Sequence, residues 1–409
     1  MGSTKTRLGL WMIGACGGVG STVALGLAAM RRGLTETAGL VTELPLFKPL
    51  DLVSVQPAGA SPAIVVGGHE IRSETLPETV KSSHESAGLF DETLIRACAA
   101  DLRAMQKNVL PGTLCGAAPP LRNMADRVGL CVEESPAESI SRLGADIRAF
   151  RKRHRLDRVV VVNIASSERL VPHRPAHGKY ASLQRELTKK GARALPTSSI
   201  YALAAIETGC PYINFTPSTG VNIPAIRKRA EELGVPYMGS DGKTGETLLK
   251  SVLAPMFAMR NLRVLSWFGQ NILGNRDGHT LRDPATRTAK LKSKDKTVTS
   301  IIDGAPMTRT SIDFVPSLHD WKVAWDFIHF RGFLNTKMSM QFTWHGSDSA
   351  LAAPLVIDLA RLAAHFAKTG VGGPMRHLAC FFKDPIDVGD HNLFAQWRLM
   401  EEYVREAGV

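Results

Sequence analysis

Residues 8–30 read LGLWMIGACGGVGSTVALGLAAM, and this stretch decides the fold. The apolar segment Leu8–Ile13 predicts a short buried strand, and the alanine-rich end of the stretch predicts a helix. Between them lies a glycine-rich turn, Gly14–Thr22. Such a turn lets the backbone approach a pyrophosphate, and the following helix offers free N–H groups at its N-terminus. The stretch therefore predicts a dinucleotide-binding unit, with a tight structural turn as the alternative.

The glycine pattern departs from the common G-x-G-x-x-G at Cys16, which replaces a glycine of the first pair. The hydroxyls of Ser21 and Thr22 can add hydrogen-bond donors. The candidate cofactor contacts in the turn are Gly14, Cys16, Gly17, Gly18, Val19, Gly20, Ser21 and Thr22. Glu43 and Glu70 are the two candidates for holding the adenosine ribose, and either can instead be a surface carboxylate.

The same stretch imitates a membrane anchor, because Leu8–Met30 holds no charged residue and follows Lys5 and Arg7. Five glycines between Gly14 and Gly26 would weaken a membrane helix, whereas a strand, a turn and a helix account for the whole stretch. We therefore expect no targeting or transmembrane segment.

The composition is that of an ordinary folded protein, with 44% hydrophobic and 22% charged residues. Because 409 residues exceed what one core usually organises, we expect two structural units. The net charge of +12 is compatible with nucleic acid, anionic membranes or small anionic substrates. The densest basic run, Arg148–Arg158, has helical spacing and few aromatics, which favours a solvated helix face over a nucleic-acid surface.

The six cysteines form no C-x-x-C pair, which fits neither a zinc site nor a disulfide scaffold and favours a reducing cytoplasm. His173 and His177 are four residues apart, but Pro175 interrupts the helix that would align them as metal ligands. We expect no structural metal at this place.

In the first half of the chain, short apolar runs alternate with helical patterns, as an α/β fold with a parallel sheet requires. Val159–Val162 is the clearest buried strand, and the polar loop Asn163–Arg169 follows it at the edge where open α/β sheets bind ligands. Ser198–Glu207 is expected as a helix and Pro211–Phe215 as the next strand.

The second half begins with an expected helix at Glu246–Met259. Alternating patterns then predict an antiparallel sheet of strands at Arg263–Phe268, Val323–Phe330 and Thr336–Trp344. Asp348 and Ser349 can cap a long buried helix that includes Leu355–Phe366.

Lysines in apolar surroundings are the main chemical signal of this half. Lys322 and Lys383 are flanked by Trp and Phe, so they either point into a site or lie over an aromatic ring. The segment Asp241–Gly245 (DGKTG) invites a P-loop interpretation, which we reject because Tyr237 stands where the first glycine is required. Other polar candidates are Asn275, Asp277, Lys292, Lys294, Lys296 and Asp348.

Together with their order, these blocks make the chain resemble the myo-inositol-1-phosphate synthase family, especially its short archaeal and bacterial form. The matching blocks include TELP, GGHEI, NIASSER, GSDGKTGETLLKSVLAPMFA, NILGNRDG, SKDK, DWKVAWDF and FFKDP. The resemblance implies a Rossmann-type doubly wound parallel sheet with an inserted α+β catalytic and oligomerisation domain. The expected limits are 1–246 for the NAD-binding domain, 247–350 for the inserted domain and 351–409 for a returning segment.

The activity implied is an NAD-dependent, redox-neutral conversion of D-glucose 6-phosphate to a myo-inositol phosphate by oxidation, enolisation, aldol closure and reduction. Positive groups near oxygen assist each step. The resemblance implies Lys294 for proton transfer at the C5 hydroxyl, Lys383 for the C1 oxygen, and Lys322 and Lys243 for phosphate or enolate charge. Asp320 and Asp348 match carboxylates near the nicotinamide and substrate. The matched cofactor contacts are Glu70 at the ribose, with Ala165, Ser166, Ser167, Thr216, Asp241, Thr244, Asn275, Asp277 and Ser349.

One departure concerns a lysine that the family places where Val298 stands here, with Lys296 as the nearest substitute. For that reason a dehydrogenase or cyclase of a related sugar phosphate, and a non-catalytic regulator that binds NAD or sugar phosphate, stay as alternatives. The resemblance also implies an ammonium, potassium or divalent cation as an aid and a cytoplasmic homotetramer formed through the second sheet. Neither nucleic acid nor membrane is expected as a partner.

Overall fold

Seven parallel strands form the larger of two sheets in the computed structural model, which describes residues 6–56, 63–131, 133–189, 194–275, 278, 297–304 and 306–407. The order across this sheet is β11-β6-β5-β4-β1-β2-β3. Its strands are β1 (Leu8–Ile13), β2 (Ile64–Glu70), β3 (Val109–Pro111), β4 (Arg158–Asn163), β5 (Tyr212–Asn214), β6 (Pro236–Gly239) and β11 (Gly373–Pro374).

The order 3-2-1-4-5-6 reverses between β1 and β4, and open α/β sheets bind ligands at such a switch point. In register, Leu8 of β1 lies between Ile64 of β2 and Arg158 of β4. All residues of β1 and β2 are buried, so the sheet is covered on both faces. The expected strands at Leu8–Ile13 and Val159–Val162 are confirmed.

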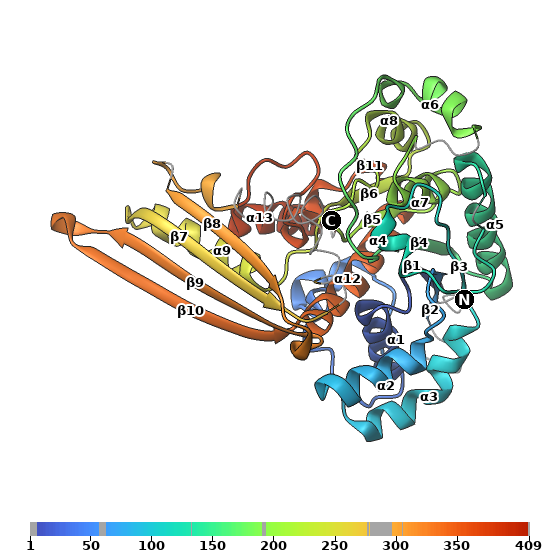
Figure 1. Cartoon of the computed structure of the whole chain (residues 1–409), viewed down its shortest axis with the longest axis horizontal. Helices are drawn as coiled ribbons and strands as arrows, with labels where there is room; N and C mark the ends of the chain where they lie inside the picture. The colour runs from blue at the N-terminus through green and yellow to red at the C-terminus, as the bar shows by residue number, and fades with distance from the viewer. Residues whose placement is uncertain are drawn as a thin grey trace.

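Helices cover both faces of this sheet (Figure 1). α1 contacts α12 on one face, and α5 contacts α7 on the other. The helices are α1 (Gly18–Arg31), α2 (Leu76–Ala87), α3 (Glu92–Gln106), α4 (Pro119–Arg122), α5 (Pro136–His154), α6 (Tyr180–Leu187), α7 (Thr197–Ile206), α8 (Pro224–Glu232), α9 (Gly245–Met259), α12 (Asp348–Lys368) and α13 (Leu393–Ala407). The short 3-10 helices are η1 (Val41–Glu43), η2 (Pro45–Leu50), η3 (Pro175–Gly178), η4 (Pro316–Leu318), η5 (Phe333–Asn335) and η6 (Arg376–Phe381).

The second sheet has four strands in the order β10-β9-β7-β8, and it projects from the α/β body in Figure 1. Its strands are β7 (Arg263–Leu273), β8 (Met307–Phe314), β9 (Trp321–Arg331) and β10 (Lys337–Ser347). The expected antiparallel pairing of the strands at Arg263–Phe268, Val323–Phe330 and Thr336–Trp344 is confirmed by β7, β9 and β10, and a fourth strand, β8, lies parallel to β7. We did not predict β8, whose polar sequence MTRTSIDF pairs with a strand far back in the chain.

Helix α9 covers one face of the four-stranded sheet. Its residues Ala254 and Phe257 pack against Trp267, Ile328 and other apolar side chains to form a small separate core. On the opposite face Trp325 is 41% exposed and stacks on Phe327, with ring centroids 6.4 Å apart. Among the described residues no helix packs on that face.

Helix α12 returns the chain from the four-stranded sheet to the α/β body (Figure 1). Its N-cap is Ser347, whose hydroxyl accepts a hydrogen bond from the N–H of Ala350 at 3.1 Å. Asp348 and Ser349, which we expected as caps, are instead the first helical residues. Within the described chain α12 alone is long and apolar enough to cross a membrane, but 67% of its apolar window is buried in the protein. It is therefore a core helix.

The structure also describes the basic run, the thiols and the histidine pair that the sequence singled out. Arg148, Arg151, Lys152 and Arg153 on α5 are exposed, while Phe150 faces the core. All six cysteines are free. His177 hydrogen-bonds to the Ala194 carbonyl at 2.8 Å, and within the described ranges three or more His, Cys, Asp or Glu side chains nowhere gather as a metal site would require.

Candidate active site

A cavity of about 630 Å³ opens at the carboxyl edge of the parallel sheet. Its walls come from the glycine turn, from the segments after β2, β4, β5 and β6, and from the start of α12. Ligand pockets usually fall within roughly 300–1,000 Å³. The cavity has a volume in this range. Because residues that follow β1 and β4 line it, it lies at the switch point between these two strands, and segments next to the four-stranded sheet also line it.

The glycine turn needs glycine for steric reasons that differ between positions. Gly14 has φ of +81°, and a Cβ there would lie 2.9 Å from the Cα of Ala165. A Cβ on Gly20 would lie 2.2 Å from the carbonyl oxygen of Ala15. Because neither position carries a side chain, α1 and the loop after β4 lie close to the end of β1. The free N–H groups of the first turn of α1 face the cavity there.

Only part of the predicted turn reaches the cavity. Gly14, Gly17, Gly18 and Val19 line it, whereas Cys16, Gly20, Ser21 and Thr22 do not. The hydroxyls of Ser21 and Thr22 donate to the Gly18 carbonyl at 3.0 and 2.7 Å. They are therefore used inside α1, and the expectation that they add donors for a ligand is not supported. Burial raises the pKa of the Cys16 thiol to about 12, so this thiol stays protonated.

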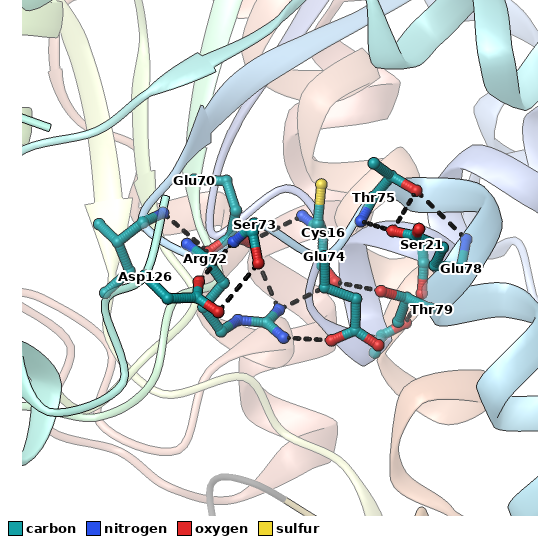
Figure 2. Close-up of polar contacts among 12 residues, drawn as sticks. Cys16, Ser21, Glu70, Arg72, Ser73, Glu74, Thr75, Glu78, Thr79 and Asp126 are labelled. Atoms are coloured by element: carbon teal, nitrogen blue, oxygen red, sulfur yellow. Dashed lines mark hydrogen bonds and ion pairs between the residues drawn. The ribbon is translucent and has the colours of Figure 1, made fainter. Parts of the chain in front are cut away.

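Of the two ribose candidates, Glu70 lies at the cavity and Glu43 does not. Glu43 forms an ion pair of 2.7 Å with Arg361. The Glu70 carboxylate accepts hydrogen bonds from the N–H groups of Cys16 at 2.9 Å, Ile71 at 2.9 Å and Arg72 at 3.2 Å (Figure 2). Glu70 thereby connects the glycine turn to the end of β2.

Arg72, which we did not predict, lines the same corner of the cavity. Figure 2 shows its guanidinium beside Glu74. The guanidinium donates to the Glu74 carboxylate at 2.7 Å and to the backbone carbonyl of Cys16 at 3.0 Å. Its charge is thus balanced by neighbouring carboxylates. The only signal in the sequence was its position two residues after Glu70, next to the end of a parallel strand.

The loop after β4 brings Ala165, Ser166 and Ser167 to the cavity, as expected. It also brings Glu168, which was not among the predicted site residues. The Glu168 carboxylate accepts a hydrogen bond from the N–H of Ser198 at 3.0 Å, at the start of α7. Burial raises the pKa of this carboxyl. Glu168 therefore caps α7 inside the cavity wall.

An ion pair between Lys383 and Asp241 lies in the cavity wall. Their Nζ and Oδ1 atoms are 2.9 Å apart, and both residues are buried. Asp241 follows β6 and Lys383 follows η6, so segments far apart in sequence form this pair. Thr216 and Thr244 line the cavity beside it. The prediction that Lys383 points into a site agrees with this position.

A second ion pair joins Lys322 at the start of β9 to Asp348 at the start of α12, with Nζ and Oδ1 3.3 Å apart. Asn275 donates to the other oxygen of Asp348 at 3.4 Å. Asp348 and Asn275 line the cavity, whereas Lys322 is not among its lining residues, so the expectation that Lys322 points into the site is not supported.

Asp320 and Ser349 bring the second sheet against the glycine turn. The Asp320 carboxylate accepts the hydroxyls of Ser347 at 2.5 Å and Ser349 at 2.6 Å. A Cβ on Gly18 would lie 2.6 Å from the Ser349 hydroxyl and 3.4 Å from Asp320 Oδ1. Burial raises the pKa of Asp320. Gly18 is therefore a point of close contact between the glycine turn and the residues just before β9 and just after β10.

Lys243 behaves differently from the other predicted lysines. It is 3% exposed, it does not line the cavity, and its ammonium donates to Gln396 of α13. Burial lowers its pKa to about 8. The expected contact of Lys243 with phosphate or enolate is not supported by this orientation.

Several predictions fall on residues whose surroundings are not described. Asp277, Lys292, Lys294 and Lys296 lie outside the described residues. Val298 is described, and it is 1% exposed in the small core under the four-stranded sheet. A lysine at position 298 would therefore point into that core and away from the cavity.

A buried ionic layer beneath the four-stranded sheet was missed entirely. The ammonium of Lys250 lies 2.7 Å from Glu246 Oε1 and 4.0 Å from Asp326 Oδ1, and all three residues are at most 1% exposed. A Cβ on Gly269 would lie 2.2 Å from Glu246 Oε1. The i,i+4 spacing of Glu246 and Lys250 was the only signal, and it usually marks a surface pair.

The strand order, the glycine turn at the switch point and the cavity beside it define a Rossmann-type dinucleotide-binding protein. The buried Lys383–Asp241 ion pair that lines the same cavity is typical of an enzyme of this class.

The chain belongs to the myo-inositol-1-phosphate synthase family, because the sequence model of that description matches residues 8–405. Inositol-3-phosphate synthase 1 of Bacteroides thetaiotaomicron is 30% identical over 98% of this chain and 95% of its own. Isozyme 1 of the same enzyme from Arabidopsis thaliana is 26% identical over 87% of this chain and 74% of its own.

Two solved structures share the fold over nearly the whole chain. Inositol-3-phosphate synthase of Caenorhabditis elegans has a TM-score of 0.82 at 22% identity, covering 99% of this chain and 86% of its own. A myo-inositol-1-phosphate synthase-related protein of Thermotoga maritima has a TM-score of 0.71 at 20% identity, covering 98% of both chains. The expected fold class, a doubly wound parallel sheet with an additional α+β unit, is confirmed.

Proposed function

We propose that this chain is an inositol-3-phosphate synthase, which isomerises D-glucose 6-phosphate to 1D-myo-inositol 3-phosphate with NAD. The observation that carries the proposal is the buried Lys383–Asp241 pair, which lies in the same cavity wall as the glycine turn. Membership of the family and a relative of that name along nearly the whole chain support it.

The residues at the glycine turn fit NAD. Gly14, Gly17 and Gly18 leave the backbone bare where side chains would fill the cradle, and α1 begins there. Arg72 is held by Glu74 and the Cys16 carbonyl, so its charge is already balanced and a ribose 2′-phosphate would gain little. We therefore assign NAD in preference to its phosphorylated form. When bound, NAD would take a hydride from C5 and return it after ring closure.

The chain's own residues would then manage charge and protons. In the aldol step the C6 carbanion forms a bond to C1, and the C1 carbonyl oxygen takes up a proton. We assign Lys383 to this oxygen, because a buried ammonium stabilises developing negative charge strongly. Asp241 would keep Lys383 charged and oriented. Lys322, held by Asp348, would balance phosphate or enolate charge, and Lys294 stays our prediction for the C5 hydroxyl.

We also propose a cation next to Asp320. A pyrophosphate at the N-terminus of α1 would approach the Asp320 carboxylate, which lies 3.4 Å from the Cβ position of Gly18. Two anions this close repel each other unless a cation lies between them. The carboxylate and the Ser349 hydroxyl would hold an ammonium, potassium or divalent ion.

We further propose a cytoplasmic homotetramer and a division of the chain at 1–246, 247–350 and 351–409. The uncovered face of the four-stranded sheet, with Trp325 exposed, supports contact between copies there. Trp325→Asp is expected to yield a smaller species in sedimentation, whereas Leu233→Asp, which is 43% exposed on the α/β body, is expected to stay assembled. The free cysteines support a reducing compartment.

An NMR time course with glucose 6-phosphate and catalytic NAD+ tests the proposed function. We expect an inositol phosphate to accumulate without net NADH. If NADH grows in proportion to the sugar consumed, the chain is a dehydrogenase instead. If neither product forms, the regulator alternative remains, which the missing lysine at Val298 and the basic balance of the chain suggested.

A further inference from the structure

Lys243 is a buried cation that the proposed mechanism does not use. Its ammonium donates to the side-chain amide oxygen of Gln396, and Gln396 is fully buried on α13. The amide nitrogen of Gln396 donates in turn to the Asp390 carbonyl at 2.6 Å. Burying an ammonium costs several kcal/mol unless hydrogen bonds compensate for lost water. The contact with Gln396 is therefore an important compensation for Lys243.

The backbone of Lys243 belongs to a short two-stranded ladder. Its N–H donates to the Phe381 carbonyl at 2.8 Å, and the N–H of Lys383 donates to the Asp241 carbonyl at 2.7 Å. A further bond runs from the N–H of Ser240 to the Asp384 carbonyl at 2.8 Å. The ladder thus holds Asp241 and Lys383 opposite each other, and their side chains form the ion pair in the cavity.

The ladder is confined on its other side as well. The N–H of Gly242 donates to the Phe215 carbonyl at 3.0 Å, and a Cβ on Gly242 would lie 2.1 Å from the ring of Phe215. The segment 240–243 is therefore pressed between the end of β5 and the segment 381–384. Any shift of α13 relative to Lys243 would be transmitted through these close contacts.

We propose that Lys243 is a positioning residue, whose contact with Gln396 fixes α13 against the ladder and so sets the Lys383–Asp241 pair. The side chains of Asp241 and Thr244 face the cavity, while that of Lys243 faces α13. The catalytic consequence rests on the proposed function, because it assumes that Lys383 acts on substrate. The structural claim does not depend on it.

The single variants Gln396→Leu and Lys243→Met and their combination test the proposal in the full-length protein. Gln396→Leu keeps Lys243 buried and removes its acceptor, so we expect kcat to fall about 10- to 100-fold as the ladder shifts. Amide hydrogen exchange of the Lys243 and Lys383 N–H groups is expected to quicken about tenfold or more. In Lys243→Met/Gln396→Leu no buried charge is left at position 243, and kcat is expected to recover to within about fivefold of wild type.

The controls separate positioning from unfolding. Arg398→Leu changes an exposed residue of the same helix and is expected to leave both kcat and exchange unchanged. Gln396→Glu keeps an acceptor for Lys243 and is expected to retain the slow exchange. It keeps the proposal testable if Gln396→Leu does not fold.

The outcomes are distinct. If Gln396→Leu is fully active while Lys243→Met and the double variant are equally inactive, Lys243 acts on the substrate and our inference is wrong. If wild type forms no inositol phosphate, the proposed function fails, and the exchange measurement alone then decides. Unchanged exchange in Gln396→Leu would overturn the positioning role in either case.

Discussion

The two sheets contribute to the cavity in different ways. The seven-stranded sheet offers mainly backbone, with glycines at the turn and carboxylates such as Glu70 and Glu168 that accept hydrogen bonds from N–H groups. The four-stranded unit holds charged side chains in pairs, of which Asp348, paired with Lys322, lines the cavity. Its other pair, Lys250 with Glu246, lies beneath the four-stranded sheet and does not line the cavity. The difference shows that recognition of a cofactor by shape is confined to the α/β body. Charge is handled by pairs from both parts of the fold, because Lys383 and Asp241 also belong to the α/β body.

The stability of the four-stranded unit should be sensitive to the loss of a buried charge, and Lys250 tests this. We expect Lys250→Met to lower the free energy of unfolding by about 3–5 kcal/mol, because two buried carboxylates lose the ammonium beside them. Chemical denaturation measures the effect, with exposed Lys337→Met as the control. The triple variant Glu246→Gln/Lys250→Met/Asp326→Asn should recover most of the loss. A loss below about 1 kcal/mol for Lys250→Met would show that the layer is well solvated.

Lys383 tests the chemistry of the charged pair that the α/β body itself supplies to the cavity. Lys383→Met should lower kcat about 10²- to 10³-fold, the usual effect of removing one preorganised electrostatic group. NAD affinity should change less than about threefold, because the cradle is backbone from the other side of the cavity. The rate of inositol phosphate formation by NMR and calorimetric NAD binding measure the two effects, with exposed Lys368→Met as control. Equal losses of both would contradict the division of labour.

Gly18 tests the recognition of the cofactor by the shape of the glycine turn. A Cβ on Gly18 would lie 2.6 Å from the Ser349 hydroxyl, so Gly18→Ala should weaken NAD binding about 10- to 100-fold by pushing the two sheets apart. Gly26→Ala on the same helix meets nothing within 4 Å and should instead stabilise the protein by about 0.5–1 kcal/mol. Normal NAD binding by the Gly18 variant would show that Ser349 can move without cost.

The smallest effect concerns pH and Lys243. Its folded pKa of about 8 is below the ordinary value of 10.5, so above pH 8 the folded state binds fewer protons than the unfolded state. Stability from this group therefore rises with pH between about 8 and 10.5, and the cost of burying the charge is constant below pH 8. Wild type should gain about 1 kcal/mol over Lys243→Met between pH 8 and pH 9. Parallel stability curves for the two proteins would place the pKa elsewhere.

The same contrast explains what the sequence could predict. The strand Leu8–Ile13 and the glycine turn were predictable, because buried parallel strands and tight turns leave local patterns of apolar and glycine residues. The direction of Lys243 was not, since it depends on Gln396, 153 residues further along the chain. The buried Glu246–Lys250 pair was not predicted, because its i,i+4 spacing is that of any exposed helical pair. Strand β8 was missed because its pairing partner is remote in sequence.

The return of the chain through α12 has a consequence for biosynthesis. Strand β6 is made before the four-stranded unit, and Lys383 is made after it, yet Lys383 and Asp241 must meet in one cavity. Domains fold as they leave the ribosome, with earlier segments first. The glycine turn and the first six strands are therefore made while both α12, which covers one face of their sheet, and the lysine opposite Asp241 are still unmade. An unfinished chain would lack the helix that packs on α1 behind its nucleotide cradle as well as the lysine that the proposed chemistry needs.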